Sequence, residues 1–196
     1  MRPTPWKTIG RAGAALWQDR RAMVLQETAI IMPLFVMLLL GGYEIARFTL
    51  LQQKLSRTTI AAADLVSQAE TVSVPEVDSI LTATTAMMLP FTTGASQRVI
   101  VTSVSATGAA VPKVDWQRLG GGTLAGVTSQ IGAVSADATL PTGFLVRSGE
   151  NVIFAEIFYQ FSPTFLADIV PPNLLYHRAA FRPRVTSLST LCANPC

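Results

Sequence analysis

The longest apolar segment of the chain lies within residues 27–65, which read ETAIIMPLFVMLLLGGYEIARFTLLQQKLSRTTIAAADL. Residues 28–43 are sixteen residues without a charge, whereas a transmembrane helix needs about 20 apolar residues. The segment reaches that length with residues 23–26 or 45–51, because Arg47 can extend its guanidinium to the headgroups. Apolar residues then continue at helical spacing as far as Ala69. The pattern predicts one uncleaved membrane helix over residues 23–51, continued by a helix over 52–70.

The composition of the whole chain favours one anchor and one modest domain. Of the 196 residues, 49% are hydrophobic and 14% are charged, whereas soluble domains have about 25% charged residues. High hydrophobicity with a net charge of +3 excludes a wholly disordered chain, and the single span argues against a polytopic membrane protein. A cleaved signal peptide is the alternative to an anchor. It fits the basic start and the apolar core, but GGYEIARF is a poor cleavage site.

The distribution of charge predicts the orientation of the membrane helix. Residues 1–21 contain five basic residues and one acidic residue, whereas the remainder has ten basic and eleven acidic residues. Because basic flanks stay in the cytoplasm, we expect a cytoplasmic leader over residues 1–22 and an exported C-terminal part.

The two cysteines, Cys192 and Cys196, lie in the sequence CANPC at the end of the chain. Exported domains keep disulfides, and Asn194 with Pro195 favours a turn that brings the two thiols together. A disulfide between them is the main expectation. Free thiols or intermolecular pairing is one alternative, and half of a metal site is another, for which no other ligands lie nearby.

Residues 71–196 predict a small exported α+β domain. A helix is expected over residues 73–90, since Pro75 suits the first turn and Glu76 is placed favourably for the helix dipole. Residues 106–149 form a loop-rich stretch, in which the glycines at 120–122 are expected to give flexibility. Strands are expected at residues 98–105, near 111–116, at 151–162 and at 175–188. The expected assembly is a small antiparallel sheet packed on the C-terminal half of one long helix.

No pattern of catalytic residues is present in the sequence. The chain has a single histidine, His177, which argues against most Ser-His-Asp, Cys-His and histidine-based metal sites. Glu150 and Glu156 share a strand face but are too far apart to act as a pair. We therefore expect no enzyme, no cofactor, no metal site and no nucleic-acid partner. The basic cluster Arg178, Arg182 and Arg184 is expected at a solvated strand edge, and the aromatic residues Phe154, Phe158, Tyr159 and Phe161 in the core.

Several residues of the membrane segment are unusual. Glu27 lies just before the apolar run, where a carboxylate is either placed at the headgroup boundary or has a function. Pro33 removes a helix hydrogen bond, which membrane helices tolerate. Glu44 and Arg47 lie on one helix face and can pair. Gly42 and Ala46 form a small-xxx-small pair, which allows close approach of another helix.

Together these residues resemble the N-terminal signature of TadE-like proteins, the minor pseudopilins of the tight-adherence (Tad/Flp) pilus system. Glu27 and Pro33 have the six-residue spacing of that family. LLLGGYEIAR supplies Gly41, Glu44 and Arg47, and LLQQKLSRTTIAAADL matches the polar and alanine-rich continuation. The resemblance covers residues 20–66, about a quarter of the chain.

The resemblance implies a pilin-like fold and cleavage by a prepilin peptidase between Ala22 and Met23. Ala22 stands where the family usually has glycine, and Thr28 where an aromatic residue is common. Glu27 would then be the fifth residue and would neutralise the α-amino group of a neighbouring subunit. Subunit contacts are expected at Glu27, Gly42, Glu44 and Arg47.

In function, the resemblance implies a structural or assembly component of a Tad/Flp pilus used for adhesion and biofilm formation. Its partners would be other pilins, the assembly machinery and the peptidase. It would lie in the bacterial inner membrane, with a periplasmic C-terminal domain that can enter an extracellular pilus. One alternative is a single-pass envelope protein with an exported ligand-binding domain that does not polymerise. Another is a secreted hydrolase behind a signal peptide.

Overall fold

The computed structural model describes residues 20–108, 111–165, 167, 171–194 and 196, with side chains from Met23 onward. Most of the predicted leader therefore lies outside the described residues. The described residues form an α+β fold with a long helix, a second helix and a four-stranded antiparallel sheet, which confirms the predicted class. In chain order the elements are α2 (Arg20–Ser67), α3 (Val74–Met87), the short 3-10 helix η1 (Gly94–Ser96), β1 (Gln97–Ser105), β2 (Lys113–Gly120), β3 (Asn151–Phe161) and β4 (Asn173–Phe181).

The helix α2 is 48 residues long and contains Pro33 in its interior. From Met23 it is long and apolar enough to cross a membrane. Pro33 lacks an N–H, so the carbonyl of Ala29 loses its helical donor, yet the helix continues beyond it. The chain divides into two compact units after Ala46, and the second, Arg47–Cys196, is called the folded unit below.

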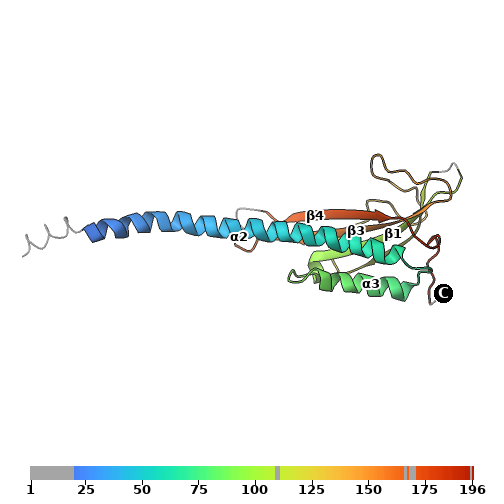
Figure 1. The fold of residues 1–196 in the computed structure, drawn as a ribbon, viewed down its shortest axis with the longest axis horizontal. Helices are drawn as coiled ribbons and strands as arrows, with labels where there is room; N and C mark the ends of the chain where they lie inside the picture. The colour runs from blue at the N-terminus through green and yellow to red at the C-terminus, as the bar shows by residue number, and fades with distance from the viewer. Residues whose placement is uncertain (1–19, 109–110, 166, 168–170, 195) are drawn as a thin grey trace, which may run out of the picture. The chain divides into compact units, whose positions relative to one another are not determined.

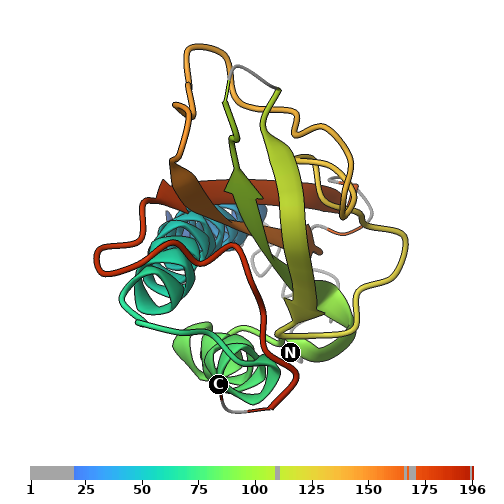
Figure 2. The same ribbon diagram turned by 90° about the vertical axis from the view of Figure 1, so that its right-hand side faces the viewer.

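The sheet of the folded unit has the strand order β2-β1-β3-β4, with every neighbouring pair antiparallel. β3 is central and is buried along its length except at Gln160. Strands covered on both faces show such continuous apolar runs, whereas strands with one wet face alternate. Figure 2 shows the reason, since α2 and α3 lie on one side of the sheet and the long connection before β3 lies on the other.

Two groups of buried side chains fill these two faces. On the helix side, α2 and α3 pack on alternate residues of β1 and β3. The helices contribute Leu51, Leu55, Val66, Val77 and Leu81, and the strands contribute Val99, Val101, Ile153 and Ile157. On the other side, the connection between β2 and β3 contributes Ile131, which packs with Val104, Val114, Val152 and Phe154. Phe144 also meets Phe154 edge-on, with ring centroids 5.4 Å apart.

The C-terminal segment ties the folded unit together. The carbonyl of Leu188 accepts hydrogen bonds from Trp116 Nε1 at 2.8 Å and from Ser103 Oγ at 3.0 Å. The backbone of Cys192 then bonds to Val72 and Val74, between α2 and α3. A disulfide joins Cys192 to Cys196.

Several expected boundaries differ from the structure, including the end of the long helix, which lies at Ser67 instead of residue 70. The last strand ends at Phe181 instead of residue 188, because Pro183 has no N–H to donate to the ladder. The short strand expected near 111–116 runs over Lys113–Gly120, since it pairs with Val99–Ser105 of β1. α3 ends at Met87, three residues before the expected end at Pro90.

The glycines at 120–122 do not serve as a flexible loop. Gly121 and Gly122 have φ values of 63° and 141°, and a Cβ on Gly122 would lie 2.1 Å from the carbonyl oxygen of Gln97. The Gln97 side chain donates to the carbonyl of Gly121 at 2.8 Å. Glycine is required here because two backbone segments approach too closely for any side chain.

Candidate functional site

The apolar segment of α2, residues 23–46, is the most exposed hydrophobic surface among the described residues. Every residue from Met23 to Leu39 is exposed, and consecutive residues of a helix point in all directions. The exposed fractions of Leu25, Met37 and Leu38 are 71%, 71% and 66%. A helix that is apolar on all sides fits hydrocarbon, whereas one that docks on a protein needs one apolar stripe.

The charged residues at the two ends of the apolar segment are far apart. Glu27 and Glu44 are separated by 17 helical residues, which is about 25 Å along the axis. The hydrocarbon core of a bilayer is about 30 Å thick, so one carboxylate can lie near each boundary. The structure therefore does not bring these two predicted site residues together. Glu27 is exposed, whereas Glu44 is buried at 8%.

The other predicted residues of this segment lie on the helix surface. Met23 is 69% exposed, and the side chain of its predicted cleavage partner Ala22 lies outside the described residues. Gly42 and Ala46 are both exposed, and a Cβ placed on Gly42 would meet nothing within 4 Å. The small-residue pair is thus open to a neighbouring helix.

Arg47, the first residue of the folded unit, contacts that unit directly. Its Nη1 donates to the carbonyl of Ser162 at 3.1 Å. Its Cζ lies 5.5 Å from the ring centroid of Phe161 and 5.9 Å from that of Phe91. A guanidinium over aromatic faces is attracted to both rings. Arg47, expected to contact other subunits, is therefore used at least in part to hold α2 on its own sheet.

Glu156 is a buried polar residue whose role the sequence did not reveal. It is 0% exposed, on the face of β3 turned away from the helices. Its carboxylate accepts hydrogen bonds from Ser129 Oγ, from the Gln130 N–H at 2.9 Å and from the Tyr176 hydroxyl at 2.8 Å. Burial, followed by the hydrogen bond to Glu156, raises the pKa of Tyr176. The available signal was a single charge in a strand that is otherwise almost entirely apolar.

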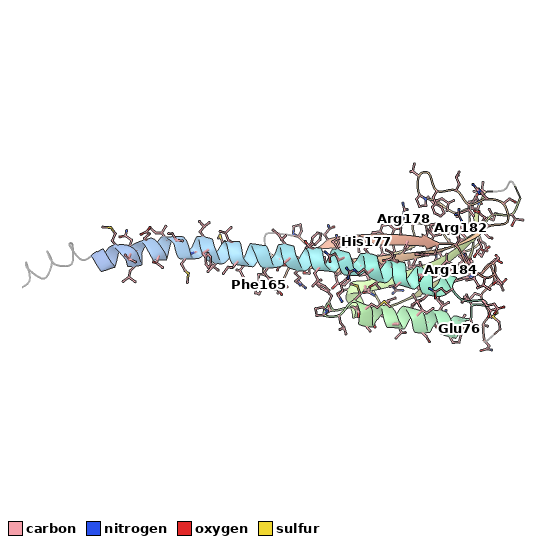
Figure 3. All side chains as sticks on the ribbon, viewed as in Figure 1. Glu76, Phe165, His177, Arg178, Arg182 and Arg184 are labelled. Atoms are coloured by element: carbon pink, nitrogen blue, oxygen red, sulfur yellow. A yellow bond between two sulfur atoms is a disulfide. The ribbon has the colours of Figure 1, made fainter. Side chains whose placement is uncertain are left out.

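Several other charged residues form ion pairs at the surface. Glu150 precedes β3 and pairs with Arg182 at 3.3 Å, and Arg184 pairs with Asp64 at 2.8 Å. Figure 3 shows Arg178, Arg182 and Arg184 along β4 and the segment after it. Because two of the three arginines face carboxylates, they do not form a continuous basic surface. The aromatic residues expected in the core, Phe154, Phe158, Tyr159 and Phe161, are all buried.

A groove of about 410 Å³ lies between the end of α2 and the start of α3. Its lining is mostly apolar and includes Val66, Val72, Val77 and Ile80, with Glu76 as its charged residue. Among the described residues, no group of three or more His, Cys, Asp or Glu side chains could hold a metal ion.

Comparisons of the chain with protein-family models, with curated protein sequences and with solved structures find no match. Function is therefore inferred from the residues and geometry of this chain.

Proposed function

We propose that the chain is a single-pass membrane protein that acts as a minor pseudopilin of a Tad/Flp-type pilus. One observation carries the proposal. A single helix, α2, is apolar and exposed on all sides in its first part and packs on an antiparallel sheet in its last part. That combination suits a pilin-like subunit, in which the first part of one helix anchors the chain and the last part packs on the sheet of the exported domain. The resemblance of residues 20–66 to TadE-like proteins supports the same assignment.

Cleavage between Ala22 and Met23 would place a new α-amino group at the start of the apolar segment. A cation at that depth needs a negative partner. Glu27 is four residues from Met23 and exposed on α2, so it is available to the amino group of a neighbouring subunit. The open surface at Gly42 and Ala46 would let a second helix approach closely. In this assignment the folded unit is periplasmic, which suits the disulfide between Cys192 and Cys196.

Processing of the N-terminus tests the proposal. The full chain is co-expressed with a prepilin peptidase, extracted from the membrane fraction and analysed by intact-mass spectrometry. We expect a mature chain that begins at Met23, and an unprocessed chain when the peptidase is omitted. Ala22→Leu should block the cut, because a large side chain replaces the small residue at the cleavage position, whereas Ala22→Gly should not. A chain that keeps Met1 in the presence of active peptidase contradicts pilin-type processing.

The groove at Val66, Val72, Val77 and Ile80 favours a second candidate function. Its apolar lining and its volume suit a small ligand, as in an envelope protein whose exported domain binds without polymerising. Crosslinking in the membrane distinguishes the two functions. A pseudopilin should crosslink to other pilin subunits through residues near Gly42, whereas a monomeric binding protein should not.

A further inference from the structure

Three large apolar side chains are exposed at one end of the folded unit. The exposed fractions of Leu89, Phe165 and Leu174 are 64%, 56% and 46%. These three are called the basal residues here. Exposure of large apolar side chains at one end of a domain costs free energy in water, unless something covers them.

The basal residues lie at the end of the folded unit that contains Arg47, the first residue of this unit. Arg47, the first residue of the unit, contacts Phe91 and Ser162. Leu89 is two residues before Phe91, and Phe165 is three residues after Ser162.

Contacts of the sheet and of α3 also place the basal residues at this end of the folded unit. Leu174 pairs with Gln160 near the end of β3. Lys54 Nζ donates to the carbonyl of Met87 at 3.2 Å, which places the last turn of α3 beside the same part of α2. Figure 1 shows the end of α3 and the start of β4 at this end of the folded unit.

The charges at this end complement an anionic surface. Among the described residues, the ranges 87–98, 158–165 and 171–175 contain no Asp or Glu, and α2 contributes Arg47 and Lys54. Glu44, one helical turn before Arg47, is buried, and Asp168 lies outside the described residues. The opposite end of the unit is different, because its exposed ion pairs include Asp64 and Glu150. Bilayers with anionic lipids attract basic residues placed within a Debye length of their surface.

We propose that the basal residues rest in the interfacial layer of a phospholipid bilayer, so that the folded unit contacts the membrane surface as well as being tethered to it. The inference depends on the membrane anchoring contained in the proposed function. Because Arg47 follows the apolar segment directly, chain continuity holds this end of the unit near the headgroups. Leu and Phe side chains at that depth leave water for the apolar part of the interfacial layer.

Depth-dependent fluorescence quenching tests the proposal on the full chain. Leu89→Trp and Phe165→Trp are reconstituted in vesicles of phosphatidylcholine and phosphatidylglycerol, with and without dibrominated acyl chains. The matched control is Leu145→Trp, since Leu145 is 78% exposed and its carbonyl accepts from Arg182 beyond the far end of β4. The emission of the parent chain, which has three tryptophans, is subtracted. We expect a blue shift and loss of most of the added emission for the two basal variants, and no loss for Leu145→Trp.

The outcomes separate this inference from the proposed anchoring. If the variants stay in the membrane after carbonate extraction but the basal tryptophans are not quenched, the basal contact is wrong and the anchor stands. A blue shift without quenching means that a protein surface, such as a second copy, covers these residues, and it also overturns the inference. If carbonate releases the chain, the anchoring itself fails. Should one basal variant misfold by circular dichroism, Leu174→Trp replaces it with the same expectation.

Discussion

At the scale of single residues, two positions in the folded unit have strict structural requirements: a buried carboxylate and a glycine in close backbone contact. Glu156 has three hydrogen-bond donors around it, from β4 and from the connection between β2 and β3. Gly122 lies where no side chain fits. Neither residue touches the apolar segment, so changes there should alter stability without altering membrane insertion.

Replacement of Glu156 tests the buried cluster. Glu156→Ala should lower the free energy of unfolding by about 3 kcal/mol, because the Tyr176 hydroxyl and the Gln130 N–H lose their acceptor in a buried site. Urea unfolding of the full chain in detergent, followed by circular dichroism, measures the change. Glu150→Ala is the control, and its exposed pair with Arg182 should leave the midpoint nearly unchanged. Equal shifts for the two variants would contradict the assigned role of Glu156.

A pair of glycine variants tests the close approach at Gly122. Gly122→Ala should destabilise the unit by about 2–3 kcal/mol, since the new Cβ overlaps the carbonyl of Gln97. Gly126 also has a positive φ, of 75°, but a Cβ there meets nothing within 4 Å. Gly126→Ala should therefore cost only about 1 kcal/mol of backbone strain. The same urea titration compares the two variants. An equal loss in free energy of unfolding would show that the positive φ, and not the contact with Gln97, determines the effect.

At the scale of elements, side chains from separate helices and strands hold α2 on the sheet. Arg47 connects α2 to the end of β3, and His177 of β4 forms a hydrogen bond between its Nε2 and the side-chain oxygen of Gln52. Figure 3 shows His177 beside α2. Phe48 adds an edge-on contact with Phe161, at 5.3 Å between ring centroids. These contacts hold residues 47–52 of α2 against the sheet.

Loss of the Arg47 side chain should weaken this attachment. We expect Arg47→Ala to lower the free energy of unfolding by about 2 kcal/mol, through one charged hydrogen bond and two ring contacts. Arg57→Ala on the exposed side of α2 serves as the control and should change little. Unfolding in urea, monitored by tryptophan fluorescence, provides the measurement. An unchanged midpoint for Arg47→Ala would show that the ring contacts do not stabilise the unit.

The pH dependence of stability should report on His177. Burial lowers the pKa of His177 in the folded state, so the unfolded chain binds a proton more readily. The stabilisation is therefore complete above the unfolded pKa of about 6.5 and is lost as the pH falls from there through the lowered folded pKa. Melting temperatures between pH 7.5 and 5.5 should fall for the parent chain. They should fall less for His177→Gln, because the chain has no other histidine; parallel curves would contradict this assignment.

At the scale of the whole molecule, the part of the chain that the structure describes has one helix that is long and apolar enough to span a membrane. The apolar segment of this helix offers lipid an apolar surface on all sides, and its two carboxylates lie near its ends. A charge placed in its middle would have to enter hydrocarbon, whereas a charge on the folded unit would remain in water.

A charge in the middle of the segment should therefore impair insertion. Leu38→Arg adds about 3 kcal/mol to the free energy of insertion and should reduce the carbonate-resistant fraction of the chain. Leu145→Arg, at a more exposed leucine of the folded unit, should leave that fraction unchanged. Immunoblots of carbonate-washed membranes measure both. Full retention of Leu38→Arg would indicate that the segment is not surrounded by lipid.

Local patterns in the sequence determined the long helix, α3 and the three main strand positions. Helical apolar spacing predicts α2, and Pro75 with Glu76 marks the start of α3. The structure adds a cap there, because the Ser73 N–H donates to Glu76 Oε2 at 2.9 Å. These signals depend on residues a few positions apart, so they can be recognised without the fold. The same is true of the apolar segment, whose length and composition alone predict its membrane location.

Only the tertiary structure decided what surrounds the residues that these patterns left ambiguous. The partners of Glu156 come from positions 20 to 27 residues away in sequence, and Leu188 bonds to Trp116 across 72 residues. The glycines at 120–122 read as a flexible loop until the approach of Gln97 showed that they lie in a crowded turn. Burial, close approach and hydrogen-bond partners arise when distant segments meet, and local periodicity contains no information about which segments those are.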